Sequence, residues 1–240
     1  MKVINLISGP RNISTALMYS FAQRQDFEVL DEPFYGYYLK HAELTISHPS
    51  HSEIIESMDS DEESIVENIN RIALEKHVFV KGMAHHFLSD EPYYLADWSN
   101  VILIRHPMKL IASFSKVISN PTLADIGIKK ASELMTYLRS IGKSPIVLDS
   151  DELMINPENY IKKLCDLLDI GYNHTMMSWK KGGIPQDGVW SGHWYKRVHQ
   201  TTGFKVQQKK PETVPPHLGP LLAEALPFYD SLKPYILKNG

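Results

Sequence analysis

The stretch INLISGPRNISTAL, residues 4–17, joins a continuous apolar run to the start of a helix. The apolar run stops at Gly9, and a segment with helical spacing of its apolar residues opens at Ser14. A strand, a short loop and a helix N-terminus in this order are typical of phosphate binding, because free backbone N–H groups favour an anion. A nucleoside-triphosphate loop would carry Gly-Lys where Ile13-Ser14 stand here, so an ATPase or GTPase is disfavoured. The stretch predicts an anion-binding loop, with an ordinary helix cap at Ser14 as the alternative.

Outward from this stretch, strand-like and helix-like segments alternate. Short apolar runs predict parallel strands at 2–8, 27–33, 77–83, 100–107 and 144–150. Helical spacing predicts helices at 14–24, 63–76, 108–119, 124–142, 157–168 and about 219–237. The polar, acidic residues 51–64 predict a mobile surface segment. The alternation predicts an α/β fold with one parallel sheet, helices on both of its faces, and one domain over residues 1–240.

The composition limits the classes of function. Of 240 residues, 43% are hydrophobic and 22% are charged, which is ordinary for a globular protein. A formal net charge of -3 argues against a nucleic-acid partner that needs a broad basic surface. Cys165 is the only cysteine, so the sequence offers no intrachain disulfide and no cysteine-based zinc site. The first residues lack a signal-peptide pattern and no apolar run is long enough to cross a bilayer, so we expect a cytoplasmic enzyme without membrane contact.

Ligands of a parallel α/β sheet bind beyond the carboxyl ends of its strands. The candidate site residues are therefore those at the predicted strand ends, namely residues 11–15, Asp31-Glu32, Lys81 with His85 and His86, and Arg105-His106. The eleven histidines are scattered along the chain, and adjacent His85 and His86 would point to opposite sides if they lay on a strand. We therefore expect no metal site.

The stretch VILIRHPMKLIASFSK, residues 101–116, places Arg105 at a strand end and Ser113 two turns into the next helix. Here the sequence resembles the sulfotransferases that use 3′-phosphoadenylyl sulfate. In that family a P-K-S-G-T-T loop binds the 5′-phosphosulfate, and an Arg with a Ser eight residues later binds the 3′-phosphate. PRNIST, residues 10–15, resembles that loop.

Two later segments, 149–170 and 182–204, also resemble family segments in the same order, the second being a loop that closes over the nucleotide. The resemblance implies a three-layer sandwich like that of P-loop nucleotide-binding proteins, and a sulfate donor that needs no metal. It implies that the donor is bound by Arg11, Asn12, Ile13, Ser14, Thr15, Arg105 and Ser113. Two of these depart from the family pattern: Arg11 stands in place of Lys, and Ile13 in place of Gly.

Sulfonate transfer is an in-line displacement that needs a base at the acceptor and cations at the leaving oxygen. We favour Glu32 as the base, since relatives of the bacterial glycolipid type and the tyrosine type use a Glu. His85 and His86 are the rivals, because the cytosolic branch uses a His soon after a Lys, although with K-x-H rather than K-x-x-x-H spacing. The resemblance implies that Lys81, with Arg11, assists the leaving group.

Other features leave alternatives open. The aromatic residues 33–39 follow Glu32 and favour a small-molecule acceptor with apolar or aromatic character. Aromatic residues of the later chain would either stack on adenine, line the acceptor pocket or belong to the core: Trp179, Trp190, Trp194 and Tyr195. We expect Lys209 and Lys210 to be exposed. Two other functions remain possible: a kinase with a degenerate loop, which would bind ATP with magnesium, and a non-catalytic nucleotide-binding relative. The oligomeric state is not indicated.

Overall fold

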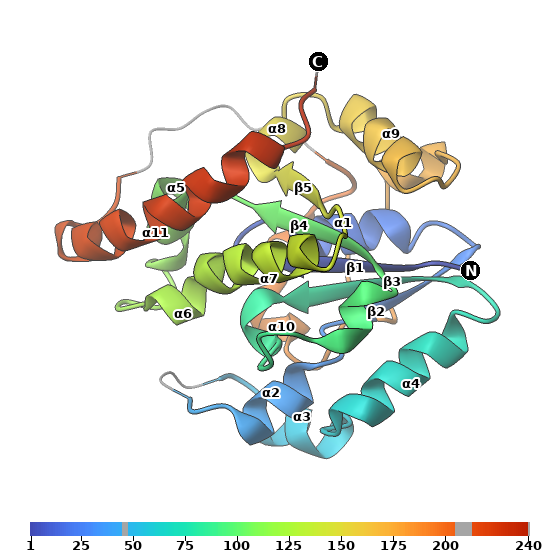
Figure 1. Ribbon diagram of the computed structural model, residues 1–240, viewed down its shortest axis with the longest axis horizontal. Coiled ribbons are helices and arrows are strands. Elements are labelled where there is room, and N and C mark those ends of the chain that lie inside the picture. Colours follow the sequence, from blue (N-terminus) through green and yellow to red (C-terminus); the bar gives the residue numbers. More distant parts are fainter. Residues whose placement is uncertain (45–47, 205–212, 240) are drawn as a thin grey trace.

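The computed structural model describes residues 1–44, 48–204 and 213–239 (Figure 1). Lys209 and Lys210 lie outside the described residues. Within them, five strands form one sheet in the order β2-β3-β1-β4-β5, and every neighbouring pair is parallel. The strands are β1 Val3–Ser8, β2 Phe27–Asp31, β3 His77–Met83, β4 Ser99–Ile104 and β5 Ile146–Asp149. The predicted strands and their parallel pairing are confirmed.

Helices cover both faces of the sheet, as predicted. Helices α1 (Ser14–Phe21) and α9 (Pro157–Leu167) pack on the face that receives Ile4 and Leu6 of β1. The opposite face receives Val3 and Ile7 and is covered by α4 (Glu62–Ile72), α5 (Pro107–Phe114), α7 (Ile128–Ser140) and α11 (Gly219–Leu232). Figure 1 shows α7 and α11 in front of the sheet and α1 behind it. Because the apolar residues of each strand alternate between two helical layers, the strands read as continuous apolar runs.

The acidic segment 51–64 differs from its prediction. It contains α3 (His51–Ser57), which buries Ile54 completely, and its end forms the start of α4, where Asp61 accepts a hydrogen bond from the Ser64 backbone. The expectation of a mobile surface segment was wrong for α3, because an apolar side chain in a polar stretch was enough to attach it to the core. The remaining short helices are α2 Tyr35–His41, α6 Leu123–Ile126, α8 Ser150–Leu153 and α10 Ser191–Trp194.

The helix predicted over 124–142 is broken at Gly127, which has a φ of 70° and separates α6 from α7. This break packs against the loop after β1. A Cβ atom on Gly9 would lie 2.4 Å from the carbonyl oxygen of Ile126, so the two backbones meet where no side chain fits. Single 3-10 turns complete the described elements: η1 Ala84–His86, η2 Tyr93–Ala96, η3 His174–Met177, η4 Val198–Gln200, η5 Pro216–Leu218 and η6 Lys233–Tyr235.

The carboxyl ends of the strands point toward α5 and α6 in Figure 1. The predicted site residues lie at this edge in two groups. One group lies beyond β2 and β3, and the other lies beyond β1 and β4.

Candidate functional site

A buried ion-pair cluster lies where β2 and β3 end. Asp31, the last residue of β2, is opposite Lys81 of β3 in the sheet register. The Lys81 side chain has no exposed surface, and its Nζ donates to Asp31 Oδ1 at 2.9 Å and to Glu32 Oε1. A buried ammonium needs such acceptors, because nothing else replaces its water shell. Two consecutive carboxylates at one strand end supply them.

The third acceptor of Lys81 comes from residues 182–204, which we call the late segment. Lys81 Nζ donates to the Tyr195 hydroxyl at 2.6 Å, and that hydroxyl lies 2.8 Å from Asp31 Oδ1. Trp190 Nε1 donates to the same hydroxyl at 3.0 Å. Tyr195 is 5% exposed, so the late segment closes this cluster against water.

The cluster contains one ammonium and two carboxylates, and therefore one excess negative charge. Desolvation acts to lower the pKa of Lys81, but the charges of Asp31 and Glu32 outweigh it and the pKa is raised. Desolvation raises the pKa of the Glu32 carboxyl, which Lys81 opposes and Asp31 reinforces. Burial and the same carboxylates raise the pKa of Tyr195 well above its ordinary value. The Tyr195 hydroxyl therefore keeps its proton, Lys81 stays charged, and the excess charge gives Glu32 an increased affinity for a proton.

Glu32 is held in an uncommon backbone conformation, with a φ of 49°. Its N–H donates to the carbonyl of Lys81 at 2.7 Å, which extends the β2–β3 pairing by one residue. Oε1 is occupied by Lys81, whereas no hydrogen bond to Oε2 is found among the described residues. Oε2 lies 4.0 Å from His86 Nδ1, which is too long for a hydrogen bond. Among the residues that the structure describes, one oxygen of this carboxylate is therefore left without a hydrogen-bond donor.

His85 and His86 lie on the turn η1 rather than on a strand, because β3 ends at Met83. The alternation of a strand therefore does not apply to them, and their rings meet edge to face with centroids 4.7 Å apart. The His86 ring stacks on Tyr35 and Tyr38, with centroids 4.6 and 4.9 Å away. Burial lowers the pKa of His85 to about 4 and that of His86 well below its ordinary value. Both imidazoles are therefore neutral at physiological pH, and they form an aromatic wall beside Glu32.

A loop follows β1 at the position predicted for anion binding, and it leads directly into α1. Arg11 and Ile13 both have a φ of 61°, a left-handed conformation that a side chain makes unfavourable. Ile13 thus adopts the backbone that the glycine of the family pattern would favour. Ser14 and Thr15 form the first turn of α1, with Ser14 buried and Thr15 half-buried. The Asn12 side chain points inward, where its Nδ2 donates to the carbonyl of Leu103 at 3.0 Å.

Cations converge beside this loop. Arg11 Nε donates to Ser113 Oγ at 3.3 Å, and Arg105 Nη1 donates to the Arg11 carbonyl at 3.2 Å. Burial lowers the pKa of the Arg11 guanidinium, and the nearby charges of Arg197 and Arg105 lower it further. Three guanidinium groups are thus gathered at one place, and an anion would relieve their mutual repulsion. Arg197 comes from the late segment and was not predicted from the sequence.

The late segment is fastened at two points. Gly188 N–H donates to Asp31 Oδ2 at 3.0 Å. Next to it, the Asp187 carboxylate accepts from the Tyr19 hydroxyl at 2.6 Å and lies 3.0 Å from His199 Nε2. Of the four aromatic residues singled out in the sequence, Trp179, Trp190 and Tyr195 belong to the core and are at most 5% exposed, whereas Trp194 is half-buried and packs against the core.

The sequence placed Asp31 beside Glu32 at a strand end but gave it no role of its own, and it gave Tyr195 only an aromatic role. The contact of both residues with Lys81 was not predicted. Tyr195 is 164 residues away from Asp31 along the chain and has no local pattern that predicts the contact.

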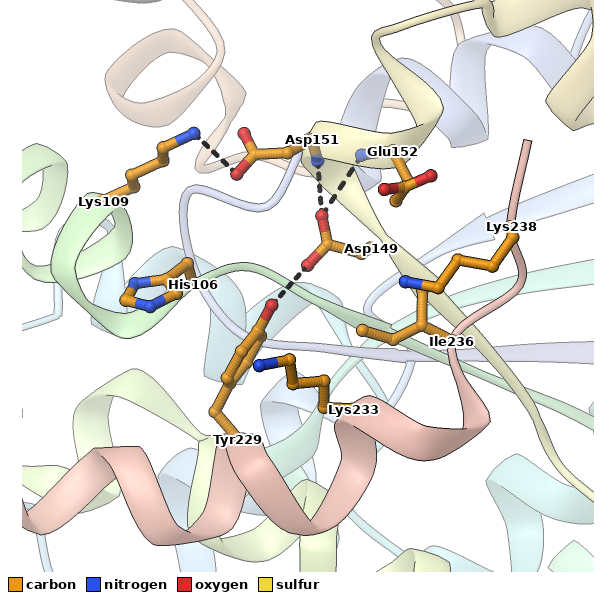
Figure 2. Close-up of a pocket in the computed structure, with 9 residues that line it drawn as sticks. All are labelled: His106, Lys109, Asp149, Asp151, Glu152, Tyr229, Lys233, Ile236 and Lys238. Atoms are coloured by element: carbon orange, nitrogen blue, oxygen red, sulfur yellow. Dashed lines mark hydrogen bonds and ion pairs between the residues drawn. The ribbon is translucent and has the colours of Figure 1, made fainter. Parts of the chain in front are cut away.

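A pocket of about 310 Å³ opens beyond β4 and β5, lined by His106, Lys109, Asp149, Asp151, Glu152, Tyr229, Lys233, Ile236 and Lys238 (Figure 2). Asp149 lies at its centre and accepts from the backbone of Asp151 at 2.7 Å and from the Tyr229 hydroxyl at 3.2 Å. Lys109 pairs with Asp151 at 2.7 Å, and His106 caps α5. None of the residues predicted to act in donor binding or catalysis lines this pocket, and its acidic groups mainly hold α8 in place.

The described residues hold no group of three or more histidine, cysteine or acidic side chains suited to a metal ion. A search of the same residues for a helix long and apolar enough to cross a membrane finds none.

Three solved structures share this fold. They are a sulfotransferase domain from the Synechococcus PCC 7002 olefin synthase (TM-score 0.58, 13% identity), one from the curacin biosynthetic pathway (0.55, 16%) and a sulfotransferase from Alicyclobacillus acidocaldarius (0.53, 12%). Each similarity covers 97% or 98% of this chain and 94% to 97% of the other. At these identities the similarity establishes the three-layer fold alone.

Two curated relatives from Arabidopsis thaliana are more similar in sequence. Branched-chain-amino-acid aminotransferase-like proteins 2 and 1 are 37% and 38% identical to 97% and 98% of this chain. The matches cover 42% of each relative, so the chain spans less than half the length of these proteins. The model of the sulfotransferase domain matches residues 1–236. A match over nearly the whole chain, on a fold shared with three sulfotransferase structures, shows that this chain belongs to the sulfotransferase domain family.

Proposed function

We propose that this chain transfers a sulfonate group from 3′-phosphoadenylyl sulfate to a hydroxyl or amine of a small acceptor. One observation carries the proposal: a cluster of guanidinium groups and a buried carboxylate with one available oxygen lie at the same edge of one parallel sheet. The first suits an anionic donor, and the second suits removal of a proton from the acceptor.

The donor is assigned to the group beyond β1 and β4. The first turn of α1 offers backbone N–H groups and the Ser14 and Thr15 hydroxyls to the 5′-phosphosulfate. Arg105 and Ser113 are assigned to the 3′-phosphate, which is the group that separates this donor from ATP. Arg11, which touches Ser113, is assigned to the bridging oxygen that leaves with the nucleotide.

The acceptor is assigned to the side of Glu32 and the histidine–tyrosine wall. The acceptor hydroxyl gives its proton to Glu32 Oε2 while its oxygen forms a bond to sulfur. The bond from sulfur to the bridging oxygen breaks, and its electron pair leaves with adenosine 3′,5′-bisphosphate. The neutral His85 and His86 rings supply an aromatic surface and hydrogen-bonding nitrogens rather than charge, which fits an uncharged acceptor.

The geometry favours a revised role for Lys81. An ammonium has three N–H donors, and all three are directed to Asp31, Glu32 and Tyr195. We therefore assign Lys81 as the counter-charge of the carboxylates, and Arg11 as the cation at the leaving group. Glu32 is preferred over His85 and His86 as the base, because its proton affinity is raised by burial whereas theirs is lowered.

The other candidate functions are less well supported. A kinase would need a lysine at its phosphate loop, and this loop has none. A non-catalytic relative would have no need to bury two carboxylates at the carboxyl ends of β2 and β3, where substrates of such sheets bind. The names of the Arabidopsis relatives describe proteins more than twice as long as the matched part, so they give no support to an aminotransferase activity here.

Calorimetric titration with adenosine 3′,5′-bisphosphate, against ATP with magnesium, tests the donor. We expect binding of the bisphosphate without metal. Replacing Arg105 by Ala should weaken it by about 1.5–3 kcal/mol, roughly 10- to 100-fold. Arg71→Ala, on the exposed side of α4, is the matched control and should leave affinity unchanged. Binding of ATP alone would support the kinase, and unchanged affinity in Arg105→Ala would remove Arg105 from the donor site.

Glu32→Gln tests the base. Removal of the carboxylate while its shape is kept should abolish most sulfonate transfer and leave bisphosphate affinity unchanged. Turnover at the wild-type rate would refute the assignment of Glu32.

A further inference from the structure

The Tyr195 hydroxyl has a complete set of hydrogen bonds. A tyrosine hydroxyl has one proton and two lone pairs. Lys81 Nζ and Trp190 Nε1 donate to it, at 2.6 and 3.0 Å, and occupy the lone pairs. Its proton is then directed to Asp31, whose two oxygens lie 2.8 and 2.9 Å away. The distance to Glu32 Oε1 is longer, 3.4 Å.

This arrangement makes the two carboxylates unequal. Asp31 Oδ1 accepts from Lys81, Asp31 Oδ2 accepts from the Gly188 N–H, and Tyr195 donates between them. Three donors thus stabilise the ionised form of Asp31. Glu32 has only Lys81 as a close donor, and its Oε2 has none among the described residues.

We propose that Tyr195 is a positioning residue that keeps Asp31 ionised and directs the proton of the acceptor to Glu32. This role deepens the proposed function and rests on it for its catalytic meaning. The proton itself moves from the acceptor to Glu32, while Tyr195 acts through Asp31 and Lys81. Without the hydroxyl, Lys81 and Trp190 each lose an acceptor and Asp31 loses a donor, so Asp31 and Glu32 become similar sites for one proton.

Five groups face Glu32, four from named elements and one from the chain just after α10. They are Asp31 on β2, Lys81 on β3, His86 on η1, Tyr35 on α2 and Tyr195 after α10. Tyr35 and Tyr195 can each lose a hydroxyl without a change of charge or of ring shape, but the Tyr35 hydroxyl bonds His48, whereas that of Tyr195 bonds Lys81 and Asp31. Tyr195→Phe is therefore the direct test.

The first readout is the order of protonation, followed by NMR in protein carrying ¹³C at the Asp and Glu carboxyl carbons. In the wild type, we expect the first proton taken up by the pair as the pH falls to appear at Glu32. In Tyr195→Phe, the Asp31 carbon should enter that same step, because Asp31 has lost a hydrogen-bond donor. Tyr229→Phe is the matched control, because Tyr229 is also buried and donates to a buried carboxylate, Asp149.

The second readout separates positioning from general loosening of the late segment. Arg197 lies two residues after Tyr195 and approaches Arg11. Arg197→Ala should weaken binding of adenosine 3′,5′-bisphosphate and leave the order of protonation unchanged. Tyr195→Phe should do the reverse.

Three results would overturn the proposal. The first is that Asp31 takes up the first proton in the wild type, and the second is that Tyr195→Phe titrates as the wild type does. The third is that Tyr195→Phe weakens bisphosphate binding as much as Arg197→Ala does. If Tyr195→Phe does not fold, Trp190→Phe removes one donor to the same hydroxyl and should shift the titration less, in the same direction. Because titration requires no turnover, absence of bisphosphate binding and sulfonate transfer would refute the proposed function and leave this test intact.

Discussion

Replacing Lys81 by Met should strongly destabilise the protein. Met has nearly the length of Lys and fills the same space, so the packing of β3 is kept while the charge is lost. The substitution leaves Asp31 and Glu32 without a counter-charge, and their side chains are only 1% and 6% exposed. Breaking a buried ion pair in this way costs about 3–5 kcal/mol.

That cost is a large part of the roughly 5–15 kcal/mol by which folded proteins are stable. For a chain of this size it corresponds to a decrease in Tm of about 6–20 °C. The matched control is Lys116→Met in the turn just after α5, where an exposed lysine should change stability by no more than about 0.5 kcal/mol.

The loss should depend on pH in a defined direction. Lys81 opposes the raised pKa of the Glu32 carboxyl, so without Lys81 that pKa rises further above its value in the unfolded chain. The folded variant then binds more protons than the unfolded variant, so its stability falls as the pH rises through the raised pKa values. The deficit relative to wild type should therefore be larger at about pH 8 than at about pH 5.

Urea denaturation of wild type, Lys81→Met and the double variant Lys81→Met/Glu32→Gln at both pH values measures these differences. The double variant buries one carboxylate fewer and should recover part of the loss at the higher pH. A deficit below about 1 kcal/mol, or one that is equal at the two pH values, would contradict the description of Lys81 as the counter-charge of two buried carboxylates.

Three further outcomes follow from the geometry. In urea denaturation, Ile13→Gly should be more stable than Ile13→Ala by about 1 kcal/mol. Both variants lose the side chain, but only Gly adopts the left-handed φ of 61° without strain. An Ala variant as stable as the Gly variant would contradict a strained loop. Burial lowers the pKa of His85 to about 4, whereas in the unfolded chain it is near the ordinary value of about 6.5. Between these two pH values the unfolded state binds a proton at His85 that the folded state does not. The free energy of unfolding should therefore fall with decreasing pH, by at most about 1.4 kcal/mol per pH unit for this residue. His85→Asn should reduce that slope, and an unchanged slope would argue against a buried neutral imidazole. The pKa of the buried Cys165 thiol is raised to about 11, so a thiol reagent near neutral pH should modify it only after unfolding; rapid modification of the folded protein would contradict its burial.

Much of the fold was predictable because its signals are local. Each strand of a sheet covered on both faces is a short apolar run, and each turn after a strand is marked by a polar, proline or glycine residue. Ser14, Arg105 and Glu32 could be placed at one edge of the sheet from the order of strands and helices alone. The resemblance to sulfotransferases added the association of Arg105 with Ser113. In the structure both residues contact Arg11, Arg105 at its carbonyl oxygen and Ser113 at its Nε.

The parts that could not be predicted depend on contacts between distant segments. Nothing near Tyr195 in the sequence indicates that its hydroxyl meets Lys81, because that contact exists only after the late segment folds back over β2 and β3. The break at Gly127 has a similar cause: its neighbours continue a helical pattern, and the kink is required by the approach of the Gly9 loop. His85 and His86 lie just beyond the end of β3, as the sequence predicted, but no local pattern indicated the η1 turn that brings their rings together.

The meeting of Gly9 with the break between α6 and α7 bears on how such loops are recognised in other sequences. Patterns for nucleotide-binding loops ask for glycine where the chain turns, yet the turning positions here carry Arg11 and Ile13. The position closed to every side chain is Gly9, since any Cβ there would collide with the Ile126 carbonyl. A pattern that demands glycine at position 13 would therefore miss this loop, whereas one that fixes Gly9 and pairs it with a helix-breaking glycine in a later segment would find it.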